Sequence, residues 1–105
     1  MINPQRGEVP ITVNGEERRM RLTLGALAAL ETRLGERSLL DMVQMFEGGA
    51  FRPSDLLALI WAGLNGGGWA VSFDDVGDCT IDGGPLEAAR AGARLLAVTF
   101  ADGAS

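Results

Sequence analysis

The stretch Glu8–Gly35, EVPITVNGEERRMRLTLGALAALETRLG, decides the fold, because its apolar residues alternate, turn at Asn14-Gly15 and then change to helical spacing. An Asn-Gly pair between two alternating runs is the strongest short-range signal for a β-hairpin. The predicted cross-strand pairs are Glu8 with Arg21, Val9 with Met20, Ile11 with Arg18 and Val13 with Glu16. The predicted apolar face consists of Val9, Ile11, Val13, Met20 and Leu22. A hairpin alone is marginally stable, so we expect helices to cover this face.

Capping residues and apolar spacing divide the rest of the chain into helices. Thr23 is a suitable N-cap for the first helix, and Gly35 is a suitable end. Ser38 with Asp41 matches a capping box for the second helix, and Pro53 suits the first position of the third. The predicted elements are a hairpin at about 8–23 and helices at about 24–34, 38–47, 53–65, 72–80 and 85–101.

These elements predict an α+β fold, mainly α, in which the N-terminal β-hairpin packs on a bundle of four to five short helices. The 105 residues are expected to form a single domain over residues 1–105. The predicted core consists of Val9, Ile11, Met20, Leu27, Leu30, Phe46, Ile60, Trp61, Leu96 and Phe100. The last helix is expected to bury the side that carries Leu86, Ala89, Ala93, Leu96 and Phe100.

The charge pattern narrows the class of partner. The formal net charge is -5, which disfavours direct binding to nucleic acid. Arg18, Arg19 and Arg21 lie close to Glu16 and Glu17, and we interpret them as a solvated hairpin face. No apolar run is long enough for a membrane span, and a single cysteine fits a reducing compartment, so a cytoplasmic protein is expected.

No residue is assigned to catalysis, to a cofactor or to a metal. The only local acidic cluster consists of Asp74, Asp75, Asp78 and Asp82. A calcium loop that begins at Asp78 requires Glu at its twelfth position, where this chain has Ala89, so we interpret the cluster as helix caps and a solvated loop. Cys79 has no histidine to activate it and is interpreted as structural or incidental. Residues 66–68, three glycines, are interpreted as a helix stop and a flexible link.

Trp69 is the residue that we select as a candidate for partner binding. It stands beside the glycine run, and exposed aromatic side chains often anchor interfaces. The alternative, in which Trp69 seals the edge of the core, stays open from the sequence and is slightly favoured. Trp61 lies on the apolar stripe of the third helix and is assigned to the core.

Three segments of the chain are recognisable together in this order: RGEV at 6–9, RLTLGALAALE at 21–31 and DLLALIWAGL at 55–64. With the alanine-rich final helix, they resemble the small gene transfer agent family of alphaproteobacterial, phage-like particles. That family is described as tail tube or tail assembly chaperone proteins. The resemblance extends over nearly the whole chain, and none of its segments is a catalytic motif.

The resemblance implies a non-enzymatic, cytoplasmic assembly factor of a siphophage-type tail. Its expected partners are the tape-measure protein, whose apolar helices it keeps soluble, and the tail tube proteins. Self-association and incorporation into the particle are left open. A structural tail tube subunit of the mature particle is the main competing function, and it is disfavoured because one hairpin supplies little sheet for a continuous β-barrel. The sequence also leaves open a small enzyme, which would require a pocket with perturbed acids, and a regulatory adaptor.

Overall fold

The Asn14-Gly15 turn closes the β-hairpin that the alternating pattern predicts. In the computed structural model, which describes residues 7–100, strand β1 covers Glu8–Val13 and strand β2 covers Glu16–Arg21. The strands are antiparallel, and their register confirms the prediction, from Glu8 opposite Arg21 to Val13 opposite Glu16. Asn14 and Gly15 have φ values of 52° and 82°, as a tight two-residue hairpin turn requires.

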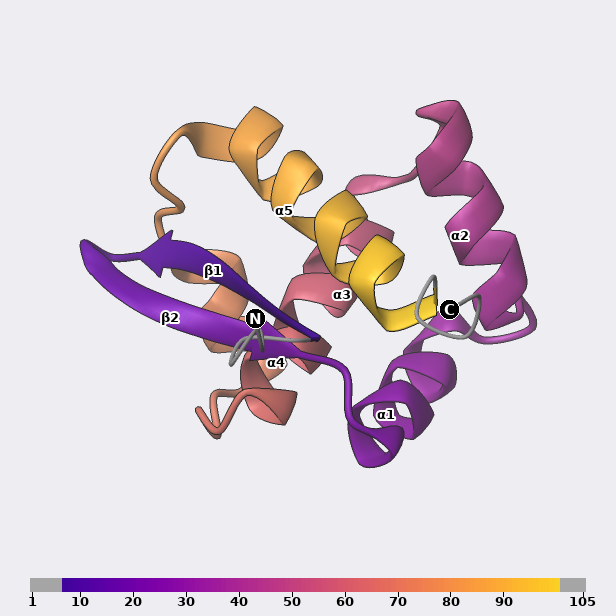
Figure 1. The fold of residues 1–105 in the computed structure, drawn as a ribbon, viewed down its shortest axis with the longest axis horizontal. Coiled ribbons are helices and arrows are strands. Elements are labelled where there is room, and N and C mark those ends of the chain that lie inside the picture. The colour runs from indigo at the N-terminus through magenta and orange to yellow at the C-terminus, as the bar shows by residue number, and fades with distance from the viewer. Residues whose placement is uncertain (1–6, 101–105) are drawn as a thin grey trace, which may run out of the picture.

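Five helices follow the hairpin within residues 7–100: α1 (Leu24–Leu34), α2 (Leu39–Gly48), α3 (Pro53–Gly66), α4 (Phe73–Asp78) and α5 (Gly84–Phe100) (Figure 1). The Oγ1 atom of Thr23 accepts a hydrogen bond from the Ala26 N–H at 3.1 Å, and Ser38 and Asp41 form the predicted capping box. The hairpin and the helices confirm the α+β, mainly α fold class. Residue 101, the last of the predicted 85–101 helix, and the outer limits of the predicted domain lie outside the described residues.

Helix α3 is the central element of the fold. It contacts β2, α1, α4 and α5, and Figure 1 shows α5 crossing near it with the hairpin to one side and α1 and α2 to the other. The predicted apolar face of the hairpin is buried against these helices, and Met20 and Val13 are almost fully enclosed. None of the helices in the described part of the chain combines the length and apolar character that crossing a bilayer requires.

The expected buried side of α5 is confirmed at Leu96 and is wrong at Leu86 and Phe100. The residues that α5 buries are Ala88, Ala91, Gly92, Leu95 and Leu96. By contrast, Leu86 and Phe100 are 63% and 43% exposed. The physical reason is that this helix carries small residues on two sides, and α3 packs on the side where Gly92 lets Leu56 and Leu59 approach. Leu27 and Trp61 pack against the core but remain partly exposed.

Glycines at the end of α3 lie directly on the backbone of β2. A Cβ atom added to Gly66 would lie 1.9 Å from the carbonyl oxygen of Arg21, and one added to Gly67 would lie 1.9 Å from that of Arg19. Only a residue without a side chain permits such an approach. The interpretation of this run as a flexible link is therefore wrong for these two glycines, which form a packing contact.

The segment before α5 contacts the other edge of the hairpin, at the end of β1 next to the turn. The Asn14 N–H donates to the Thr80 carbonyl at 2.8 Å, and the Asp82 N–H donates to the Thr12 carbonyl at 3.0 Å. Val13 and Ile81 form an antiparallel bridge at the same place. Part of each outer edge of the hairpin is therefore occupied: the C-terminal end of β1 by residues 80–82, and Arg19 and Arg21 of β2 by the end of α3.

Candidate partner-binding surfaces

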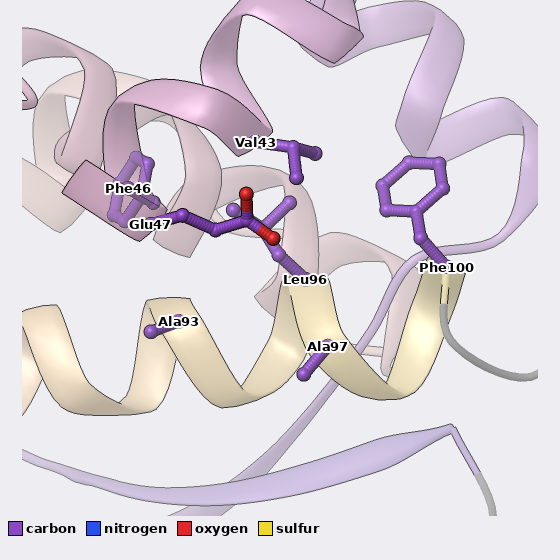
Figure 2. Close-up of a pocket in the computed structure, with 7 residues that line it drawn as sticks. All are labelled: Val43, Phe46, Glu47, Ala93, Leu96, Ala97 and Phe100. Atoms are coloured by element: carbon purple, nitrogen blue, oxygen red, sulfur yellow. The ribbon is translucent and has the colours of Figure 1, made fainter.

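An open groove of about 320 Å³ lies between α2 and α5, and we call it the α2–α5 groove. Its lining residues are Val43, Phe46, Glu47, Ala93, Leu96, Ala97 and Phe100 (Figure 2). Every one of these side chains except Glu47 is apolar. Figure 2 shows the α2 side chains on one side of the groove and those of α5 on the other, with Phe100 at one end. The groove therefore offers an apolar surface between two helices.

The small side chains of α5 keep this groove open. Ala93 and Ala97 form its α5 wall, and neither extends far enough to fill the space beside α2. Phe46 does not fill it either, because its ring stacks on Phe51 with 4.5 Å between the ring centroids. Leu96 is buried and forms part of the apolar floor. The C-terminal half of the α5 stripe that we expected to lie in the core thus lines the groove.

Among residues 7–100, Glu47 is the only charged residue that lines the groove. It belongs to the last turn of α2, where the carbonyl ends of the helix already carry partial negative charge. That turn contains no basic residue, and Glu47 makes no ion pair with any residue between 7 and 100. The Glu47 carboxylate and the carbonyl end of α2 therefore favour a cation at this end of the groove.

Trp69 is half-buried and packs against the core, next to the hairpin. The guanidinium of Arg18 lies 4.0 Å from the centre of the Trp69 ring, a distance at which a cation–π interaction forms. Arg18 also donates to Glu16 at 3.0 Å. The interpretation of the three arginines as a solvated face is therefore wrong for Arg18, which covers the Trp69 ring and is itself half-buried.

A buried ion pair joins the segment before α2 to the first turn of α3, and the sequence did not indicate it. Two nitrogens of the Arg37 guanidinium donate to the two carboxylate oxygens of Asp55 at 2.6 and 2.5 Å, and Asp55 is only 3% exposed. These hydrogen bonds lower the pKa of the Asp55 carboxyl below its ordinary value. Their geometry is bidentate and engages both oxygens of a buried carboxylate, so this pair holds the segment before α2 against α3.

The other predicted residues do not converge on a site. In the described range, no three Asp, Glu, Cys or His side chains are placed to hold a metal ion. Ser72 caps α4 through the Asp75 N–H at 3.0 Å, as the capping interpretation of this acidic segment expects. The Cys79 Sγ lies 3.1 Å from the Asp75 carbonyl oxygen and beside Asn14, which is a structural position.

Comparison with known proteins gives one family. A family model described as "Phage tail tube protein, GTA-gp10" matches residues 6–102, which is nearly the full length. A search of curated proteins gives no match. A search of solved structures also gives no match.

Proposed function

We propose, from the premise that this chain belongs to the phage tail tube protein family GTA-gp10, that it is a tail assembly chaperone of a phage-like particle. In this role it binds the tape-measure protein, keeps its apolar helices soluble and passes it to the tube subunits. Membership of the family connects the chain with the tail of a gene transfer agent. The chaperone role and the tape-measure partner are the proposed steps beyond that.

The observation that carries the proposal is that part of each outer hairpin edge is already occupied by this chain. A tube built from a continuous β-barrel joins its subunits through strands, which requires free edges or more strands than a hairpin has. Here residues 80–82 bond to the edge of β1, and Gly66 and Gly67 lie on the backbone of β2. This arrangement favours a partner that binds to helices over one that extends the sheet.

The α2–α5 groove supplies a surface of the required kind. A helix that docks in a groove places an apolar stripe between the two helices that form it. The apolar walls of the groove, with Phe100 exposed at one end, match that mode of binding. We propose that the protein acts in the cytoplasm, before the tail is complete, and that its role involves binding and no catalysis.

A second candidate function is that of a structural subunit that stays in the mature tube. The observation in its favour is the description of the family itself, which names a tail tube protein. It requires a rearrangement on assembly that frees the edges of the hairpin. The two functions differ in whether the hairpin contacts with residues 66–67 and 80–82 persist in the assembled particle.

Co-expression with the tape-measure protein from the same gene cluster tests the proposal. The tape-measure protein is expected to be insoluble alone, and to become soluble and co-purify with this chain when both are made together. A tape-measure protein that stays insoluble in the presence of this chain, or that is soluble without it, would contradict the chaperone function. An unrelated acidic protein of similar size serves as the control for a general effect of co-expression.

Trp69 remains our proposal for a second contact residue. Its ring is half-buried under Arg18, so a partner that displaces Arg18 gains an aromatic surface that is already held in place. The variant Trp61→Phe leaves Trp69 as the only tryptophan, because the chain has two. The emission of Trp69 is expected to shift to shorter wavelength when the tape-measure protein binds. An unchanged emission spectrum in the complex would contradict a role for Trp69.

A further inference from the structure

We infer that the α2–α5 groove selects an amphipathic helix that brings a Lys or Arg side chain to Glu47 and an apolar side chain to Phe100. This inference rests on the proposed function, because it names the contact face and the chemistry of the same partner. The partner helix then lies between α2 and α5, with its positive charge at the Glu47 end of the groove.

The shape of the groove points to a helix as its occupant. The lining on α5 runs from Ala93 to Phe100, so at a rise of about 1.5 Å per residue the groove is about 10 Å long and takes about two turns of a partner helix. Ala93 and Ala97 are four residues apart on α5 and lie on the same wall. Their small side chains let the backbone of a partner helix approach α5 closely.

The charge of the groove determines which amphipathic helix fits. Glu47 stands at the negative end of α2, beside an apolar lining and without a cationic partner in residues 7–100. A docked helix removes water from the groove and strengthens interactions with the Glu47 carboxylate. A basic residue next to Glu47 is therefore favoured, and an acidic residue there is repelled.

The arginines of α5 do not supply a cation for Glu47. Arg90 and Arg94 are both directed to Glu87, with nitrogen–oxygen distances of 3.9 and 3.0 Å. Because no cation among residues 7–100 pairs with Glu47, we assign the positive charge to the partner. A second copy of this chain is a poor occupant, because two molecules that each carry a net charge of -5 repel each other.

Two designed helical peptides of about 20 residues provide the probe, since shorter helices are marginal in water. Both peptides carry the same stripe of Leu and Ala residues. The Lys peptide has Lys, and the Glu peptide has Glu, at the positions that flank one end of this stripe. Titration of the full chain, followed by fluorescence anisotropy at low salt, is expected to show the Lys peptide binding about tenfold tighter than the Glu peptide. The preference should decrease as salt is added.

Charge reversal at the groove gives the matched variants. Glu47→Lys is expected to invert the preference, so that the Glu peptide binds better, whereas Glu31→Lys on the exposed face of α1 should leave it unchanged. Both variants change the net charge equally. An equal effect of the two variants, or no inversion by Glu47→Lys, would overturn the assignment of the cation to Glu47.

Steric blocking tests the groove itself. Ala97→Glu places a charged side chain against the apolar stripe of the docked peptide, so it is expected to weaken the Lys peptide at least tenfold, whereas Ala28→Glu on the exposed side of α1 should have little effect. Both alanines are exposed, so both variants should keep the wild-type melting temperature. Full binding by Ala97→Glu overturns the groove proposal, as does no binding of either peptide to the wild type. Sedimentation velocity tests whether a second copy occupies the groove. If the wild type self-associates and Ala97→Glu abolishes this association, the groove binds a second copy and the proposal is overturned.

These outcomes are separable from a failure of the proposed function. If the peptides follow the Glu47 charge but the tape-measure protein does not co-purify, the groove chemistry holds and the chaperone function fails. If the tape-measure protein co-purifies equally with wild type and Ala97→Glu, the chaperone function holds and the groove is not its contact face.

Discussion

Gly66→Ala tests the close contact between α3 and the hairpin. The φ of Gly66 is not positive and the residue is helical, so alanine fits the backbone conformation and only the contact is tested. The added Cβ would lie 1.9 Å from the Arg21 carbonyl oxygen, whereas real Cβ contacts essentially never fall below 3.0 Å. The end of α3 and β2 therefore have to separate by about 1.1 Å, the difference between these two distances. Overpacking of this kind costs about 2 kcal/mol of unfolding free energy.

The assay is thermal and urea unfolding followed by far-ultraviolet circular dichroism. A loss of about 2 kcal/mol lowers the melting temperature of a domain of this size by roughly 8–16 °C. Gly48→Ala is the matched control, because nothing lies within 4 Å of its added Cβ and its φ is not positive. It should raise the stability by about 0.4–1 kcal/mol. Equal melting temperatures for Gly66→Ala and Gly48→Ala would refute the packing role of Gly66.

Two further substitutions test the buried pair and the core. Asp55→Asn should lower the unfolding free energy at pH 7 by about 2 kcal/mol, because it removes a buried, bidentate charged hydrogen bond. Arg37 lowers the pKa of Asp55 in the folded state, so this contribution is present above the unfolded value of about 3.9 and is lost as the pH falls through the folded pKa. In urea titrations, the difference between the wild type and Asp55→Asn should therefore decrease as the pH falls below about 4 and disappear below the folded pKa of Asp55, and a constant difference would contradict this origin. Ile60→Asp should abolish the cooperative thermal transition, since Ile60 is 3% exposed and the buried charge has no partner. Leu40→Asp, at a 64% exposed position of α2, should retain a normal transition, and a normal melt for Ile60→Asp would place Ile60 outside the core.

Local signals in the sequence predicted the hairpin and the helix starts, because those features depend on neighbouring residues. The Asn14-Gly15 turn determines the register of the strands, and Ser38 with Asp41 fixes the start of α2. Each feature is set by backbone geometry within a few residues. The fold class follows from these elements and their apolar faces.

Features that join distant segments were not predictable in this way. Arg37 and Asp55 are 18 residues apart, and neither has a local pattern that names the other as partner. The close approach of Gly66 to Arg21 depends on how α3 crosses the hairpin, which a run of three glycines does not reveal.

The candidate site was missed for a different reason. Ala93, Leu96, Ala97 and Phe100 were recognisable as an apolar stripe on α5, and that stripe was assigned to the core. An alanine-rich helix has low contrast between its sides, so periodicity alone does not show which side packs on α3. In the structure, this stripe runs from the buried Leu96 to the exposed Phe100. The groove beside it is formed by the packing of α2 next to α5, which the sequence of α5 alone does not reveal.

The most direct test of chaperone function is the copy number of this chain relative to the tape-measure protein, before and after assembly. Quantitative mass spectrometry measures this ratio in tape-measure complexes isolated from lysates and again in purified mature particles. A chaperone is expected to accompany the tape-measure protein in the lysate and to fall to background in the particles. Retention in mature particles at the stoichiometry of a stacked ring would contradict the proposed function and assign the chain to the tube.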